Sequence, residues 1–322
     1  MNRRSALRFL IAAGAGSVFD RASLDRAWAA SPADGQDNFI LHSETRLVLL
    51  DVSVENRGGG FVSGLTRENF RVYENNRPQK ITVFAHNDLP VTIGILVDES
   101  RSMSPKRPAV LTAALTFISE SNPADQIFVL NFNERVKAGL VPPQIFSDNH
   151  EELRAALFRG VPEGRTALYD AVMDGLDQLE LGQRDKKALV LISDGGDNAS
   201  LHTRHETLNR IESSVATIYT VGIFDMNDAD RDPNILRQLA RLSGGRVYFP
   251  EDVTEMVPVC RRIAHEIRER YTLGYHPASP PPGKKENGLR SIRVDAVAPG
   301  RGSLIVRTRT SYRYDAQDTP KK

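Results

Sequence analysis

Residues 91–103 read VTIGILVDESRSM, and this stretch decides the fold of the 322-residue chain. Its first part, 91–97, is a continuous run of apolar character, which is typical of a strand buried on both faces of a sheet. The polar residues Asp98, Ser100 and Ser102 follow at once, with one residue between each of them. Because ligands bind beyond the carboxyl ends of the strands in open α/β sheets, these residues are candidates for a binding site.

Strand-like and helix-like patterns alternate from residue 89 to residue 270. The spacing of apolar residues predicts helices at 108–120, 149–158, 167–181, 203–213, 232–242 and 253–270. Strand-like runs lie at 126–131, 136–141, 187–193, 216–222 and 245–249, the second of them as a short edge strand. Strands that alternate with such helices imply βαβ crossovers. We therefore expect an α/β fold over 89–270, with a doubly wound, mostly parallel, Rossmann-like sheet covered by helices on both faces.

The flanks of this region have β-type patterns. An N-terminal β module is expected over 38–88, with a hairpin turn at Asn75-Asn76, and a C-terminal β segment over 271–314. Each flank is too small to bury a good core alone. We expect them to pack together as one β-sandwich with the α/β domain inserted between them, and two separate satellites are the alternative. Residues 315–322 are polar and are expected to form a disordered tail.

The first 29 residues have the pattern of a signal peptide. An apolar run at 9–19 follows an arginine-rich start, and Ala27-Trp28-Ala29 offers small residues at the spacing that a signal peptidase needs. The adjacent Arg3 and Arg4 resemble a twin-arginine export signal, although Phe9 comes later than in that pattern. The apolar run is shorter than the roughly 20 residues of a membrane span. We expect an exported protein, periplasmic or secreted; a leader that stays attached is the alternative.

Composition excludes several classes of function. The chain has 42 Lys and Arg residues against 41 Asp and Glu residues, so it has no basic excess for a nucleic-acid surface. No later segment is long and apolar enough to span a bilayer, so the mature chain has no expected membrane span. The single cysteine, Cys260, cannot form an internal disulfide and is expected to be a small buried hydrophobe.

Two further polar residues extend the candidate site. Asp194 follows the buried run at 187–193, as Asp98 follows its own strand, and Thr166 lies just before the predicted helix at 167–181. The Asp-x-Ser-x-Ser segment alone would be read as a helix cap, but three elements at three strand-end loops favour a cation site. Carboxylates and hydroxyls are hard oxygen donors that suit Mg²⁺. Without a cation, Asp98 and Asp194 would repel each other, so one would tend to take up a proton.

These residues resemble the metal-ion-dependent adhesion site (MIDAS) of the von Willebrand factor type A (VWA) domain. That motif is Asp-x-Ser-x-Ser, then a distant Thr and a distant Asp, and its positions here are Asp98, Ser100, Ser102, Thr166 and Asp194. The flanks are similar to those of a bacterial group of VWA-related proteins with a flanking β module. The resemblance implies a bound Mg²⁺, with Mn²⁺ or Ca²⁺ as alternatives. It also implies cell-adhesion-type binding of a protein partner through an acidic side chain at the metal, and no enzyme activity.

Two other functions stay open from the residues alone. A metal-assisted hydrolase would need a general base near the ion, and only Glu99 and Asp197 are available. A structural scaffold would have an empty site. His202 and His205, with Glu206, do not match the zinc pattern His-Glu-x-x-His and are expected on a solvated helix face.

Overall fold

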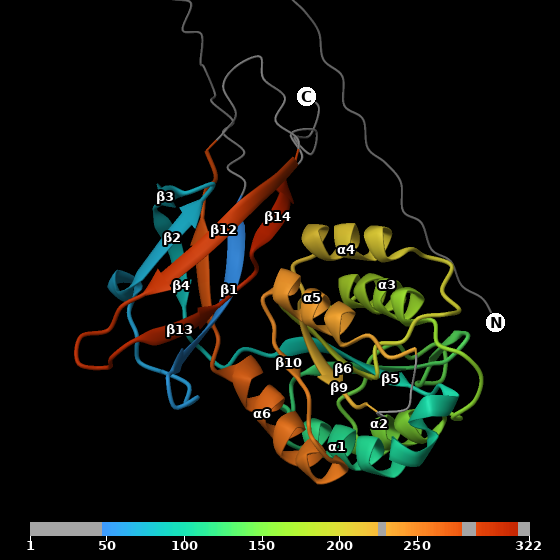
Figure 1. Ribbon diagram of the computed structural model, residues 1–322. Coiled ribbons are helices and arrows are strands. Elements are labelled where there is room, and N and C mark those ends of the chain that lie inside the picture. The colour runs from blue at the N-terminus through green and yellow to red at the C-terminus, as the bar shows by residue number, and fades with distance from the viewer. Residues whose placement is uncertain (1–46, 225–229, 279–287, 315–322) are drawn as a thin grey trace, which may run out of the picture. The chain divides into compact units, whose positions relative to one another are not determined.

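The structure is a computed structural model, and it describes residues 47–224, 230–278 and 288–314. These residues form one six-stranded sheet covered by helices and two four-stranded antiparallel sheets (Figure 1). The predicted signal peptide at 1–29 and the predicted tail at 315–322 lie outside the described residues. The domain bounds proposed from the sequence stay a prediction.

The strand that opens the quoted stretch, β5 (Val91–Asp98), lies in the middle of the six-stranded sheet. The order is β10-β9-β8-β5-β6-β7, and every neighbouring pair is parallel except β6 with β7. The other bounds are β6 Gln126–Phe132, β7 Val136–Ala138, β8 Lys186–Ser193, β9 Thr217–Gly222 and β10 Val247–Tyr248. The expected edge strand at 136–141 is too long, because the pairing of β7 with β6 ends at Ala138, which lies opposite Leu130.

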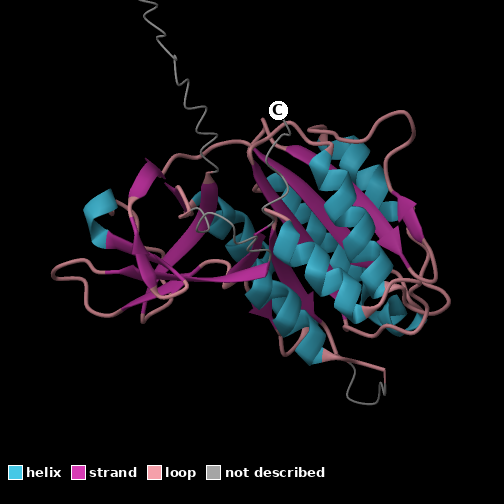
Figure 2. Ribbon diagram, turned by 90° about the horizontal axis from the view of Figure 1, so that it is seen from above, coloured by secondary structure: helices cyan, strands magenta, loops and turns pink. Residues whose placement is uncertain are grey.

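Helices cover both faces of this sheet, as Figures 1 and 2 show. Their bounds are α1 Arg107–Ser119, α2 His150–Phe158, α3 Leu168–Glu180, α4 Arg204–Ser213, α5 Pro233–Ser243 and α6 Met256–Arg268. Apolar residues of α1, α2 and α6 pack with Ile93 and Ile95 of β5, and those of α3, α4 and α5 pack with Leu96. Both faces of β5 are therefore buried, and this forces its apolar sequence.

A short 3₁₀ helix changes one predicted helix start, because η3 (Val253–Glu255) precedes α6, which begins at Met256 and not at residue 253. The loop after β5 forms a second one, η2 (Arg101–Lys106), and α1 follows it within one residue of its predicted start. The helix expected to run to residue 270 ends at Arg268, because the chain turns there into the strand that begins at Tyr271. The prediction for His202 was also wrong, since this residue lies before α4 and not on it.

The two antiparallel sheets combine segments from both ends of the described chain. Their orders are β13-β1-β11-β4 and β14-β12-β2-β3. The bounds are β1 Val48–Asn56, β2 Phe70–Glu74, β3 Arg77–Gln79, β4 Ile81–Ala85, β11 Tyr271–Tyr275, β12 Gly288–Ala296, β13 Leu304–Arg307 and β14 Ser311–Tyr314, with η1 (Arg67–Asn69) before β2. One apolar cluster joins the sheets and includes Leu50, Phe70 and Tyr271. The expected fold class, an α/β domain with a β-sandwich made from both flanks, is confirmed.

Two smaller features follow from local chemistry. Asn75 and Asn76 have φ values of 47° and 62°, the left-handed conformation of the two-residue turn predicted between β2 and β3. Cys260 is fully buried, and this burial raises the pKa of its thiol to about 12.

Among residues 47–224, 230–278 and 288–314, no helix has the length and apolar character of a bilayer span.

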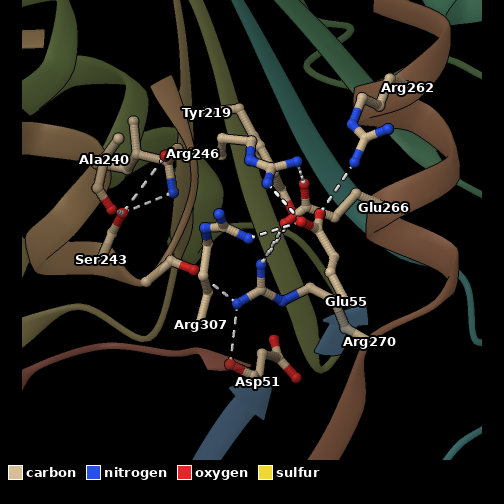
Figure 3. Close-up of polar contacts among 12 residues, drawn as sticks. Asp51, Glu55, Tyr219, Ala240, Ser243, Arg246, Arg262, Glu266, Arg270 and Arg307 are labelled. Atoms are coloured by element: carbon tan, nitrogen blue, oxygen red, sulfur yellow. Dashed lines mark hydrogen bonds and ion pairs between the residues drawn. The ribbon is translucent and has the colours of Figure 1, made fainter. Parts of the chain in front are cut away.

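A buried ion cluster connects β1 of the sandwich with the α/β domain (Figure 3). Glu55 of β1 is 1% exposed and accepts hydrogen bonds from Arg246 at 2.6 Å, Arg262 at 3.1 Å and Arg307 at 3.0 Å. Burial raises the pKa of Glu55, but Arg246 and Arg307 together lower it by more, so its net pKa lies below the usual value. Glu55 is therefore ionised at neutral pH and shared by three cations.

Arg270 forms the second half of this cluster. Its guanidinium is 3% exposed and donates to Glu266 at 3.3 Å and to the Tyr219 hydroxyl at 3.0 Å. It also donates to the backbone oxygens of Asp51 at 2.9 Å and Gly244 at 2.7 Å. The Arg270 side chain thus connects β1 of the sandwich with the C-terminal end of α5.

Replacing Glu55 by Gln should lower the free energy of unfolding by about 3 kcal/mol, at the lower end for a broken buried pair, because the arginines keep some contact with water. Urea unfolding measures this change. Glu151→Gln is the control, since that side chain is 84% exposed in its pair with Arg154, and such pairs contribute about 1 kcal/mol or less. An equal loss in both variants would contradict the role of Glu55.

Candidate metal site at the ends of β5 and β8

The structure brings the five predicted residues together at one edge of the central sheet. Asp98 ends β5, and Asp194 directly follows β8, its parallel neighbour. Ser100, Ser102, Thr166 and Asp194 line one pocket of about 340 Å³. Asp98 lies buried beside them, at 2% exposure.

Asp98 is fixed by hydrogen bonds to both of its carboxylate oxygens. Oδ1 accepts from the backbone N–H of Ser100 at 2.8 Å, and Oδ2 accepts from the hydroxyl of Ser193 at 2.6 Å. Ser193 is the last residue of β8, so this bond ties the ends of the two strands together. Sequence reasoning missed Ser193, and the only signal for it was its position directly before Asp194.

The hydroxyls of Ser100 and Ser102 and the carboxylate of Asp194 form a chain. The two serine oxygens are 3.1 Å apart, and Ser102 donates to Asp194 Oδ2 at 2.5 Å. Ser100 occupies the N-cap position of η2, but its side chain makes no capping bond. The helix-cap interpretation of the Asp-x-Ser-x-Ser segment is therefore wrong for Ser100.

Thr166 is held in place through its backbone. Its N–H donates to the side chain of Asn198 at 2.9 Å, and its carbonyl accepts from the N–H of Asn198 at 2.9 Å. The N-cap position of α3 is occupied by Ala167, not Thr166. Within the described residues, no hydrogen bond engages the Thr166 hydroxyl, which lines the pocket. Asn198 is a second residue that the sequence reasoning missed.

The loop after β8 needs glycine beside Asp194. Gly195 has a φ of +83°, and a Cβ at this position would lie 2.3 Å from the backbone oxygen of Asp232. The next N–H, of Gly196, donates to Asp194 Oδ1 at 3.1 Å. This turn therefore fixes the direction of the Asp194 carboxylate toward Ser102.

Without a cation, two ionised carboxylates are electrostatically unfavourable at this site. Burial, and then the negative charge of Asp194, raise the pKa of Asp98 to about 7. A divalent cation would relieve this repulsion. Two carboxylates and three hydroxyls are oxygen donors of the kind that Mg²⁺ prefers, so the residues present fit such an ion. The described part of the chain, this site included, holds no group of three or more His, Cys, Asp and Glu residues suited to a metal, so a cation here would depend on the hydroxyl oxygens as well.

The two residues considered as general bases are engaged elsewhere. Glu99 is 1% exposed and forms an ion pair with Arg107 at 2.8 Å. Asp197 accepts from the backbone N–H groups of Leu168 at 2.8 Å and Tyr169 at 3.3 Å, which caps the start of α3. Neither residue lines the pocket. Both carboxylates therefore have structural roles next to the site.

Charged residues of both signs surround the pocket. Arg165 forms an ion pair with Glu134 at 3.4 Å, and Asp230 accepts from the side chain of Asn198 at 2.9 Å. The Arg101 guanidinium is exposed on the same rim, and no described residue forms a hydrogen bond or ion pair with it. The rim thus offers contacts to a charged ligand beside the buried carboxylates.

Comparison with known proteins gives a match over about half of the chain. The family model described as von Willebrand factor type A domain matches residues 92–259. No curated protein sequence matches significantly. A solved structure of a von Willebrand factor type A protein from Catenulispora acidiphila is similar, with a TM-score of 0.50 and 14% identity, over 86% of this chain and 75% of that chain.

Two other solved structures have lower scores. Proximal thread matrix protein 1 from the mussel byssus, in a form with a zinc-occupied MIDAS motif, has a TM-score of 0.47 and 17% identity, over 57% of this chain and 49% of that chain. The vWF domain of the type V pili tip protein Mfa5 from Porphyromonas gingivalis has a TM-score of 0.48 and 12% identity, over 56% and 95%. This chain therefore spans about half the length of the mussel protein.

Replacing Asp98 by Asn should stabilise the cation-free protein at pH 8 by about 1–3 kcal/mol. The pKa of Asp98 is about 7 in the folded chain and 3.8 as its ordinary value, so the folded state binds the proton more tightly. Its stability therefore falls as the pH rises from about 4 to about 7, and Asn removes that loss.

Thermal melts in chelator at pH 8 and pH 5 measure this effect, which should be smaller at pH 5. Asp177→Asn is the control, because the Asp177 side chain is 66% exposed in its pair with Arg210. A melting temperature of Asp98→Asn at or below that of the wild type at pH 8 would refute the electrostatic conflict.

Proposed function

This chain belongs to the von Willebrand factor type A family, and from that premise we propose that it is a protein-binding, adhesion-type module with a cation-loaded MIDAS. The observation that carries the proposal is the convergence of Ser100, Ser102, Thr166 and Asp194 on one open pocket. Domains of this family commonly mediate protein interactions or adhesion.

The residues that would hold the cation are the five predicted ones. Ser100, Ser102 and Thr166 would contribute hydroxyl oxygens, and Asp98 and Asp194 would contribute negative charge directly or through water. Mg²⁺ is the proposed ion, with Mn²⁺ or Ca²⁺ as alternatives. Because the site has only two carboxylates, a bound divalent ion would attract an acidic side chain of a protein partner.

The contacts of Glu99 and Asp197 support binding over metal-assisted hydrolysis. A general base must lie within hydrogen-bonding reach of the water that it activates. Glu99 is buried against Arg107, and Asp197 caps α3. Neither of the two residues that the sequence suggested as a general base is therefore free to activate a water at the pocket.

The proposed localisation, outside the cytoplasm, rests on the predicted signal peptide. Residues 1–29 have the charge, apolar run and small residues of an export signal, so the protein would act in the periplasm or after secretion. A partner on the outer side of the cytoplasmic membrane would then be accessible to the pocket.

Replacing Thr166 by Val should weaken Mg²⁺ binding at least about tenfold, since it removes one oxygen donor and keeps the shape of the side chain. Isothermal titration calorimetry of the full chain at pH 8 measures the affinity. Thr112→Val is the matched control, because the exposed Thr112 hydroxyl bonds only to a backbone oxygen of its own helix. Equal affinity in all three proteins would remove Thr166 from the site, and no heat from the wild type would favour the scaffold alternative.

A protein partner should be retained from envelope extract by the immobilised wild type in Mg²⁺. Chelator should release it, and Thr166→Val should fail to hold it. Conversion of a partner glutamate or aspartate to its amide should have the same effect as chelator. Retention that survives both chelator and Thr166→Val would contradict a cation-mediated contact.

A further inference from the structure

A second pocket lies between α5, β10 and β13 and is lined by four arginines. Its volume is about 390 Å³, and the arginines are Arg237, Arg241, Arg246 and Arg307. No Asp or Glu side chain belongs to the described residues of its lining. It shares no lining residue with the pocket at the ends of β5 and β8, so it is a separate feature.

Two parts of the fold bring these arginines together. Arg237 and Arg241 stand four residues apart on α5, with Ala240 between them on the same helix face. Arg246 lies just before β10, and Arg307 ends β13 of the sandwich. Figure 3 shows Arg246 and Arg307 directed toward the same carboxylate, Glu55. The pocket exists only because the sandwich packs against the α/β domain.

Three of the arginines are already fixed in position. Arg246 and Arg307 both donate to Glu55 Oε2, at 2.6 Å and 3.0 Å. The guanidinium of Arg237 lies 4.5 Å from the ring centre of Phe249 and donates to Asn234 at 3.3 Å. A ligand that binds there would lose little of its binding energy to ordering these side chains.

The charges around the pocket do not balance. Glu55 and Glu266 face four arginines, which are Arg246, Arg262, Arg270 and Arg307. A further acid, Asp51, interacts with Arg270 and also with the basic side chains of Lys186 and Arg309. The guanidinium of Arg241 forms no hydrogen bond or ion pair with any described residue, and the backbone oxygen of Arg241 accepts from the N–H of Gly244. Since the whole chain has a net charge of only +1, this excess of positive charge is local.

Hydroxyl groups complete the lining. Thr308 and Thr310 both belong to it, and Thr308 Oγ1 is buried without a hydrogen-bond partner among the described residues. A buried hydroxyl without a partner is costly, so a ligand oxygen that accepts a hydrogen bond from it would relieve that cost.

We propose that this pocket binds a small phosphate-type oxyanion, such as the phosphate or pyrophosphate group of a soluble metabolite. Guanidinium groups match the oxygens of phosphate with paired hydrogen bonds, and the threonine hydroxyls supply further donors. The anion bridges α5 and β13, so its binding strengthens the contact between the sandwich and the α/β domain.

Calorimetry of the full chain with inorganic pyrophosphate at low ionic strength tests this site, with sodium chloride at matched ionic strength as the blank. Wild type should bind, and Arg241→Gln should bind about tenfold more weakly, as expected for one charge-assisted hydrogen bond. The double variant Arg237→Gln/Arg241→Gln should lose about a hundredfold. Arg154→Gln, an exposed arginine on α2 outside the pocket, should leave the affinity unchanged.

Melting temperatures separate ligand binding from misfolding. Arg241→Gln should melt like the wild type without pyrophosphate and gain less from its addition, because only a ligand bound to the folded state raises the melting temperature. Vesicles of phosphatidic acid, with phosphatidylcholine vesicles as the blank, separate a lipid headgroup from a free anion. Binding to those vesicles without binding to pyrophosphate would overturn the proposal, and so would pyrophosphate binding that the double variant keeps.

Discussion

Two carboxyl groups, those of Asp98 and Asp194, are held close together at the ends of the neighbouring parallel strands β5 and β8. Both residues are 2% exposed, so bulk water cannot screen the repulsion between the two carboxylates. The hydroxyls of Ser102 and Ser193 and the N–H groups of the adjoining turns bond to them, and these bonds order the loops of the site. The same burial, together with the charge of Asp194, raises the pKa of Asp98, and a divalent cation would offset this repulsion.

The central sheet could be predicted because its strands are buried on both faces. Such burial requires an unbroken apolar run like that at 91–97, and the polar residues after the run mark the edge where ligands bind. Asp194 and Thr166 could be added to the site because they lie at the ends of other predicted elements, and the family resemblance then matched all five residues. Strand ends were less predictable, as β7 shows, because they depend on where the neighbouring strand stops pairing.

The positioning residues and the ion cluster could not be predicted from local patterns. Ser193 looks like any strand-end serine, and its bond to Asp98 spans 95 positions. Glu55 has the pattern of a solvated strand residue, yet it is buried among arginines that lie 191 to 252 positions further along. Such contacts arise only when the sandwich has formed from both flanks, and that same packing creates the arginine-lined pocket.

The proposed cation site is tested most directly by a crystal structure of the full chain grown with Mn²⁺, with anomalous scattering used to locate the ion. We expect one strong anomalous peak among Ser100, Ser102 and Thr166, which is lost in crystals of Thr166→Val. An ordered site without a peak, or a peak that lies away from these hydroxyls, would contradict the claim that this edge of the sheet is a cation site.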